Sequence, residues 1–214
     1  MRPGLSASTG RSCSCSSART GRSCSCSYRC GGVGGDEGAW LAGLDAALAS
    51  GVRRVQIRLP GADAARRREL IAAAAARCRA VGADVLVNGD PELARELGVG
   101  LHLRAAQLAA LAAPGAPADR PALADGALLA ASCHDSRELA LAERLGCDFA
   151  VFGPVKPTAS HPGQPGIGWE AFAAARECVS LPVYGLGGLM PADLEEARRH
   201  GAQGIAAIRG LWPA

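Results

Sequence analysis

Polar side chains, together with two glycines, follow almost every apolar segment of the chain after residue 50. Amides, hydroxyls, imidazoles and guanidinium groups bind anions, hydrogen-bond a ring system or transfer a proton. One such residue means little, but their recurrence favours a single shared site, because parallel strands end at the same edge of a sheet. In chain order the set comprises Gln56, Arg58, Asn88, Asp90, His102, Ser132, His134, Lys156, Thr158, Ser160, His161, Gly187, Gly188 and Arg209.

The longest polar segment is the loop Lys156–Gly166, which follows the apolar run Phe149–Phe152. It carries Thr158, Ser160 and His161, and several prolines stiffen it. An ordinary connection from strand to helix has about 2–6 residues, so this loop is long for a plain surface link. Its length and its hydrogen-bonding groups predict a ligand-binding loop.

Two glycine segments near the end of the chain predict a phosphate-binding cup. Gly187 and Gly188 belong to the sequence GLGG, and Ile208 and Arg209 stand directly before Gly210. Loops after consecutive late strands of a barrel commonly present backbone N–H groups to a phosphate. The alternative interpretation is that these glycines only permit tight turns.

Short apolar segments alternate with helical segments from Asp36 onward, which predicts a parallel sheet with helices outside. Seven strands at this spacing fit a (β/α)8 TIM barrel whose first strand is missing or degraded, and a doubly wound open sheet is the alternative. His102 lies within one of these strands, and we interpret it as a packed histidine rather than a catalytic one. The predicted strands are Val55–Leu59, Asp84–Asn88, Gly100–Leu103, Leu128–Ser132, Phe149–Phe152, Pro182–Tyr184 and Gly204–Ile208. The predicted helices are Asp36–Ser50, Ala62–Val81, Pro91–Leu97 with Asp90 as N-cap, Ala105–Ala112, Asp135–Leu145, Trp169–Cys178 and Pro191–His200.

Residues 1–35 differ in composition from the rest of the chain. They contain TGRSCSCS twice, are rich in Ser, Gly, Cys and Arg, and nearly lack aliphatic residues. Such a segment buries too little surface to offset its ordering entropy, so we expect a disordered tail before one barrel domain at 36–214. A thiolate metal site is less consistent with the absence of histidine and of C-x2-C spacing there. The remaining cysteines, which we expect to be buried, are Cys78, Cys133, Cys147 and Cys178.

Composition disfavours several classes of function. The net charge of +3 is small for a nucleic-acid-binding surface. Aromatic residues make up 4% of the chain, which is too few for a base-stacking nucleic-acid platform. No apolar run reaches the ~18 residues of a membrane span, and no secretory signal is present, so we predict a cytoplasmic protein. An open sheet edge beside Val55–Leu59 would favour a homo-oligomer.

Four segments carry a resemblance to a known family, and they occur in the same order along the chain as in that family. They are VQIR at 55–58, VLVNGDPELARELGVGLHL at 85–103, SCHDSRELALAERLGCDFAVFGPVKPTASHPG at 132–163, and LPVYGLGGLMPADLEEARRHGAQGIAAI at 181–208. With them, residues 36–213 resemble the thiamine phosphate synthase and thiazole tautomerase (TenI-like) superfamily. The version that they most resemble is the C-terminal domain found behind a Nudix hydrolase.

The resemblance implies condensation of hydroxymethylpyrimidine diphosphate with thiazole phosphate to give thiamine phosphate. In this family Mg²⁺ neutralises the departing diphosphate. Arg58 and His134 would be the catalytic residues. The matching positions imply that the pyrimidine diphosphate contacts Gln56, Arg58, Asn88 and Ser132. They likewise imply that the thiazole phosphate lies near Thr158, Ser160, His161, Gly187, Gly188, Ile208 and Arg209.

The chain departs from the family pattern at several site positions. Gly89 and Gln107 stand where the family has its two Mg²⁺-binding aspartates, and Asp90 is the expected remaining ligand. Further departures are Pro60 for a basic residue, His161 for a lysine and Arg209 for a serine. Two alternatives therefore stay open. One is a metal-free tautomerase-like enzyme that uses His134 for proton transfer, and the other is a non-catalytic phosphate-ligand domain detached from a Nudix fusion.

Overall fold

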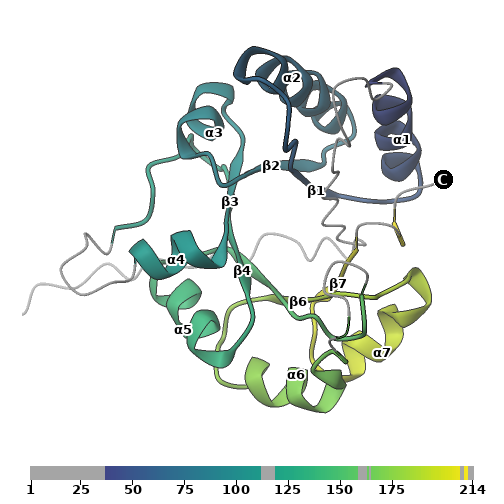
Figure 1. The fold of residues 1–214 in the computed structure, drawn as a ribbon, viewed down its shortest axis with the longest axis vertical. Coiled ribbons are helices and arrows are strands. Elements are labelled where there is room, and N and C mark those ends of the chain that lie inside the picture. The colour runs from purple at the N-terminus through teal and green to yellow at the C-terminus, as the bar shows by residue number, and fades with distance from the viewer. Residues whose placement is uncertain (1–36, 112–118, 159–162, 164, 208–209, 212–214) are drawn as a thin grey trace, which may run out of the picture.

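Seven parallel strands form one sheet in chain order, β1 to β7, in the computed structural model (Figure 1). The structure describes residues 37–111, 119–158, 163, 165–207 and 210–211, so the predicted tail lies outside the described residues. An unreversed strand order rules out the doubly wound sheet, whose order changes direction at a switch point. The strands are β1 (Arg54–Ile57), β2 (Asp84–Asn88), β3 (Gly100–Leu103), β4 (Leu129–Cys133), β5 (Phe149–Phe152), β6 (Val183–Leu186) and β7 (Gly204–Ala206).

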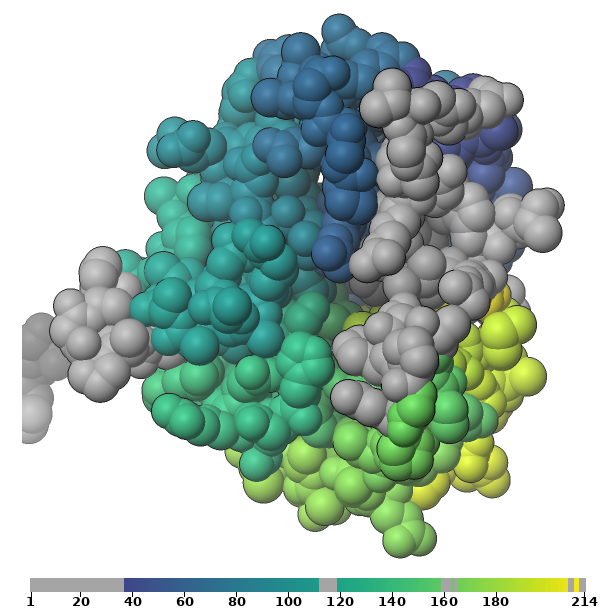
Figure 2. Space-filling model, viewed as in Figure 1, coloured from purple at the N-terminus to yellow at the C-terminus, as the bar shows by residue number. Residues whose placement is uncertain are grey.

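All seven predicted strands are confirmed, and the helices form a ring around them in chain order (Figure 1). In the space-filling view the colours run around the molecule in the same order (Figure 2). The fold is therefore of the TIM-barrel type with a curled sheet (Figure 1). An eighth strand is not among the described residues, so full closure stays a prediction. The helices are α1 (Glu37–Ala49), α2 (Ala64–Ala80), α3 (Pro91–Leu97), α4 (Ala105–Leu111), α5 (Ser136–Arg144), α6 (Gly168–Arg176), the 3₁₀ turn η1 (Pro191–Asp193) and α7 (Leu194–Arg199).

Aspartate caps fix where three helices begin. Asp63, Asp90 and Asp135 accept backbone N–H groups at 2.9, 3.0 and 2.8 Å, which confirms the predicted cap at Asp90. The predicted helix Pro191–His200 is instead split into η1 and α7. In the first turn the Asp193 N–H donates to Met190 O, three residues back, at 2.9 Å, which is the hydrogen bond of a 3₁₀ helix. The Asp193 carboxylate also accepts the Met190 N–H at 2.9 Å.

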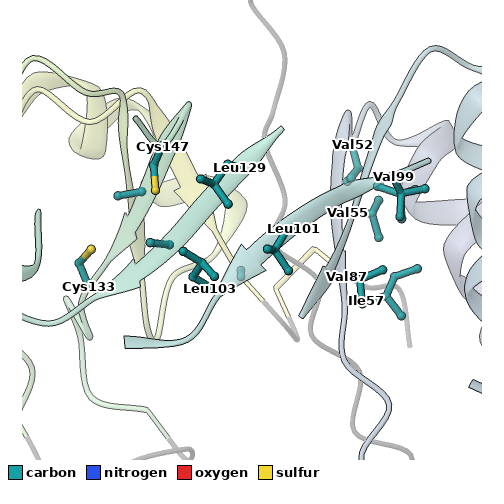
Figure 3. Close-up of a cluster of buried hydrophobic side chains, with 14 of the residues drawn as sticks. Val52, Val55, Ile57, Val87, Val99, Leu101, Leu103, Leu129, Cys133 and Cys147 are labelled. Carbon is teal, nitrogen blue, oxygen red and sulfur yellow. The ribbon is translucent and has the colours of Figure 1, made fainter. Parts of the chain in front are cut away.

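Alternating strand residues build two separate apolar layers. Outward-facing side chains such as Val55, Leu101 and Leu129 pack beneath the helices (Figure 3). The others fill the interior of the curled sheet. This is the period-2 pattern of a barrel, whose inside is a packed core rather than a channel. The inner layer consists of Leu86, Ala130, Phe149, Val151, Tyr184 and Ala206.

Arg54 shows how strongly the sheet curls. Its guanidinium donates a hydrogen bond to the Tyr184 hydroxyl on β6 and lies 5.1 Å from the centre of the Phe149 ring on β5. Arg54 itself belongs to β1, so these contacts cross the interior. They tie the first described strand to the late strands at the amino-terminal end of the sheet, away from the predicted site.

One expectation about the cysteines is wrong. Cys78, Cys133 and Cys147 are buried as predicted, but Cys178 is exposed. It lies just beyond the end of α6, in a turn that the barrel does not cover, and its thiol donates to the Ala174 carbonyl at 3.6 Å. Within the described residues, no helix combines the length and the apolar character needed to cross a membrane.

Candidate active site at the carboxyl ends of the strands

Four polar side chains from consecutive strands line the interior just above the apolar layer. Gln56 on β1 donates from Nε2 to Asn88 Oδ1 on β2 at 2.7 Å. His102 on β3 contacts the Ser132 hydroxyl on β4, with Nε2 and Oγ 2.8 Å apart. The sheet register pairs Asn88 with His102, so the two hydrogen-bonded pairs are neighbours. The structure thus brings together Gln56, Asn88 and Ser132, three of the predicted substrate-binding residues.

His102 holds this polar row in place. It is 1% exposed, and burial lowers the pKa of its imidazole from 6.5 to about 4. A neutral ring at pH 7 offers one donor and one acceptor nitrogen, and Nε2 is used by Ser132. The prediction of a packed histidine is confirmed, and its effect is to fix the direction of the Ser132 hydroxyl.

Arg58 lies one residue beyond the end of β1, where its side chain is exposed. Within the described part of the chain, it forms neither a hydrogen bond nor an ion pair. A guanidinium group presents N–H donors in a fork that matches phosphate oxygens. Arg58 therefore stands two residues after Gln56, at the carboxyl end of β1, with no partner in the described ranges.

His134 and Glu138 form a contact pair at the start of α5. The Glu138 Oε2 atom accepts the His134 backbone N–H at 2.6 Å and lies 3.1 Å from His134 Nδ1. This contact fixes the imidazole, and Nε2 has no partner among the described residues. An exposed histidine whose Nδ1 is held by a carboxylate is able to accept or donate a proton at Nε2.

The GLGG segment approaches the loop after β5 closely. The Val155 N–H donates to Leu186 O at 2.8 Å, and the Lys156 N–H donates to Gly187 O at 3.1 Å. A Cβ at Gly187 would lie 2.5 Å from Pro154 Cβ, and one at Gly188 would lie 2.4 Å from Pro157 O. The two glycines thus permit this close contact as well as the turn.

The Lys156–Asp193 ion pair ties the same loop to η1, with Nζ and Oδ1 2.8 Å apart. The hydrogen bond to Asp193 raises the pKa of Lys156. Partial burial opposes ionisation of Asp193, but the bonds from Lys156 and Met190 outweigh it and lower the pKa of that carboxyl. Thr158 is half-buried at the start of the predicted ligand loop. Ser160, His161, Ile208 and Arg209 lie outside the described residues.

The residues at the expected metal position do not fit a Mg²⁺ ion. Asp90 Oδ1 caps α3 through the Leu93 N–H, and Asp90 Oδ2 pairs with Arg67 Nη2 at 2.6 Å. The predicted role of Asp90 as a metal ligand finds no support in these contacts. Gly89 and Gln107 supply no carboxylate, and among the described residues no three His, Cys, Asp or Glu side chains form a metal-binding group.

Arg104 is a site residue that the sequence analysis missed. It follows β3 directly, and its guanidinium lies over Gly89, in contact with Gln107. The signal in the sequence was a charged residue directly after a predicted strand, with a glutamine three positions later. Glu138 is a second residue that the sequence analysis did not single out, although it lies four residues after His134.

The curled parallel sheet and this set of residues define a TIM-type α/β fold with a candidate site at the carboxyl ends of its strands. A family model described as thiamine monophosphate synthase matches residues 33–211, and the chain belongs to this family. A putative thiamine-phosphate synthase from Geobacter sulfurreducens is 36% identical over 174 residues, which span 80% of this chain and 78% of the relative.

Solved structures share the fold at lower sequence identity. A thiamine phosphate pyrophosphorylase from Pyrococcus furiosus has a TM-score of 0.68 and 22% identity, over 88% of this chain and 86% of its own. An N-acetylmannosamine-6-phosphate 2-epimerase from Clostridium perfringens has a TM-score of 0.55 and 13% identity, over 88% and 85% of the two chains. These likenesses show the TIM-type fold.

Proposed function

We propose that this member of the thiamine monophosphate synthase family condenses hydroxymethylpyrimidine diphosphate with thiazole phosphate to form thiamine phosphate. The observation that carries the proposal is the polar row of Gln56, Asn88, His102 and Ser132. Arg58, two residues after Gln56, has no partner among the described residues. Such a row presents amide and hydroxyl groups to a heterocycle, and the arginine presents N–H donors to its diphosphate. The family match over most of the chain supports the same reaction.

The chemistry assigns separate tasks to the two sides of the site. The bond between the pyrimidine methylene carbon and the diphosphate oxygen breaks, and its electron pair leaves with the diphosphate. The thiazole nitrogen then supplies the electron pair of the new C–N bond. Arg58 stabilises the charge that develops on the leaving group, which is the group that needs stabilisation in the transition state. The loops at Gly187, Gly188 and Thr158 would hold the thiazole phosphate, with Ser160, His161, Ile208 and Arg209.

Synthase turnover with Arg58→Ala tests this function. Loss of the guanidinium should lower kcat/KM about 10- to 100-fold, the usual range for a hydrogen bond to a charged group. Arg95→Ala is the matched control, because Arg95 is an exposed arginine in the last turn of α3, at the opposite end of the barrel. Absence of thiamine phosphate from both substrates under all conditions would contradict the proposal.

A second candidate is a tautomerase-like reaction on a thiazole phosphate, and the observation that favours it is the His134–Glu138 contact. Proton transfer needs only a positioned base and no leaving group. Unchanged activity in His134→Ala would count against it. Binding of thiazole phosphate and thiamine phosphate without any turnover would instead favour the non-catalytic domain related to Nudix fusions. A cytoplasmic location and a homo-oligomer stay predictions.

A further inference from the structure

The side chain of Arg104 occupies the space above Gly89, between the ends of β2 and β3. Gly89 has φ +68°, and a Cβ placed there would lie 2.7 Å from Arg104 Nε and 2.9 Å from Gln107 Oε1. No aspartate could therefore stand at position 89 unless Arg104 moved. The Arg104 guanidinium therefore occupies the space in which the carboxylate of the family's aspartate at position 89 would lie.

Gln107 holds Arg104 in this position. Its Oε1 atom accepts from the Arg104 backbone N–H at 3.2 Å and from Arg104 Nε at 3.1 Å. Its Nε2 atom donates to Gly89 O at 3.0 Å, so the amide is fixed at both ends. An aspartate at position 107 would be too short to keep all three contacts. Gln107 therefore positions the Arg104 side chain instead of acting as a metal ligand.

Within the part of the chain that the structure describes, no hydrogen bond or ion pair occupies the terminal nitrogens of Arg104, which leaves them available for a ligand. Among the described residues, no carboxylate pairs with this side chain, whereas Arg67 in α2 is paired with Asp90. Arg104 is also exposed, so a ligand can reach it from solvent. Arg58 and Arg104 follow β1 and β3, on either side of Asn88 at the end of β2.

Two carboxylates at positions 89 and 107 would repel a diphosphate unless a divalent cation lay between them. With glycine and an amide at those positions, and a guanidinium beside them, the charge there is positive without a metal. Guanidinium groups bind phosphate oxygens through paired N–H donors. We propose that the protein binds the diphosphate group of its substrate without a divalent cation, through Arg104 positioned by Gln107. This inference rests on the proposed synthase function for the identity of the substrate.

Calorimetry with inorganic pyrophosphate tests the proposal on the full chain, first in EDTA and then with MgCl₂ at the same ionic strength. We expect the wild type to bind in EDTA and Mg²⁺ to change Kd by no more than about twofold, because the arginines already supply the charge. Arg104→Gln should weaken binding about tenfold or more, and Arg104→Lys should restore part of it. Arg95→Gln, which removes the same charge at the other end of the barrel, should bind as the wild type does.

Gln107→Ala distinguishes positioning from general stability. It should weaken pyrophosphate binding in the wild-type background but cause no further loss in the Arg104→Gln background, since Gln107 acts through Arg104. An additive loss would contradict that role. The proposal is overturned if wild-type binding requires Mg²⁺, if pyrophosphate does not bind, or if Arg104→Gln binds as the wild type does. Pyrophosphate binding through Arg104 without thiamine phosphate synthesis would contradict only the proposed reaction.

Discussion

His102 and Ser132 are joined across adjacent strands, with His102 Nε2 2.8 Å from Ser132 Oγ, and the imidazole is almost completely enclosed. Because burial lowers its pKa from 6.5 to about 4, the ring stays neutral in the folded protein across mildly acidic pH. In the unfolded chain the same ring is protonated there. Acid therefore favours unfolding between pH 6.5 and about 4, and this contribution to stability is fully present only above that window.

His102→Gln should remove this acid dependence. We expect the difference in free energy of unfolding between wild type and variant to shrink by about 2–3 kcal/mol from pH 7 to pH 4.5. Urea unfolding at both pH values measures it. Ser132→Ala is the control, because it removes the hydrogen bond and leaves the imidazole buried. The free energy of unfolding of this variant should therefore depend on pH as that of the wild type does. An equal pH dependence of the free energy of unfolding in wild type and His102→Gln would show that His102 does not cause the loss of stability in acid.

Gly188→Ala should destabilise the protein and weaken the proposed phosphate cup. Position 188 has φ +66° and a Cβ there would meet the Pro157 carbonyl at 2.4 Å. Backbone strain and overpacking together should cost about 2–4 kcal/mol. Gly126→Ala separates backbone strain from overpacking, because Gly126 has φ +76° but, apart from its chain neighbours, no described residue has an atom within 4 Å of a Cβ there. Thermal unfolding and thiazole phosphate calorimetry measure the outcome, and equal losses in both variants would mean that the close contact contributes nothing.

Asn88→Asp should reduce anion affinity without disturbing the fold. The aspartate keeps the shape of asparagine and still accepts the Gln56 N–H, which is 2.7 Å from the acceptor in the native protein. It also adds a negative charge beside Arg58 and Arg104, which should weaken pyrophosphate binding about tenfold or more. Gln203→Glu makes the same change at an exposed position outside this polar row and should bind normally. An unchanged Kd for Asn88→Asp would place the diphosphate elsewhere.

Glu138→Gln tests whether His134 works as a positioned base. The amide can still accept from the His134 backbone N–H, which is 2.6 Å from Glu138 Oε2, but it holds the imidazole less strongly than a carboxylate does. If His134 transfers protons, Glu138→Gln should lower the rate of the tautomerase-like reaction, because the imidazole is positioned less firmly. Glu195→Gln, in an exposed i,i+3 pair with Arg198, is the control. A rate identical to that of the wild type would remove His134 from the chemistry.

The sequence by itself determined the elements and the edge of the sheet that carries the site. Seven apolar segments separated by amphipathic stretches specify parallel strands, because a strand covered on both faces has to be apolar throughout. Asp90 before Pro91 specified a helix start, since the aspartate side chain satisfies an N–H group that no helical carbonyl reaches. The polar residues after each strand therefore had to meet at one end of the barrel.

Only the tertiary structure decided which hydrogen bonds and ion pairs those residues form. Hydrogen bonds between residues about thirty positions apart, such as His102 with Ser132, depend on strand register and curl, which local pattern does not contain. Both oxygens of Asp90 are engaged by a helix cap and by Arg67, so a carboxylate in a suitable place is not free to bind a metal. Arg104 reaches Gly89 because β2 and β3 are neighbours and a glycine leaves space there. Because of this packing, the Arg104 guanidinium lies where the family has an aspartate carboxylate.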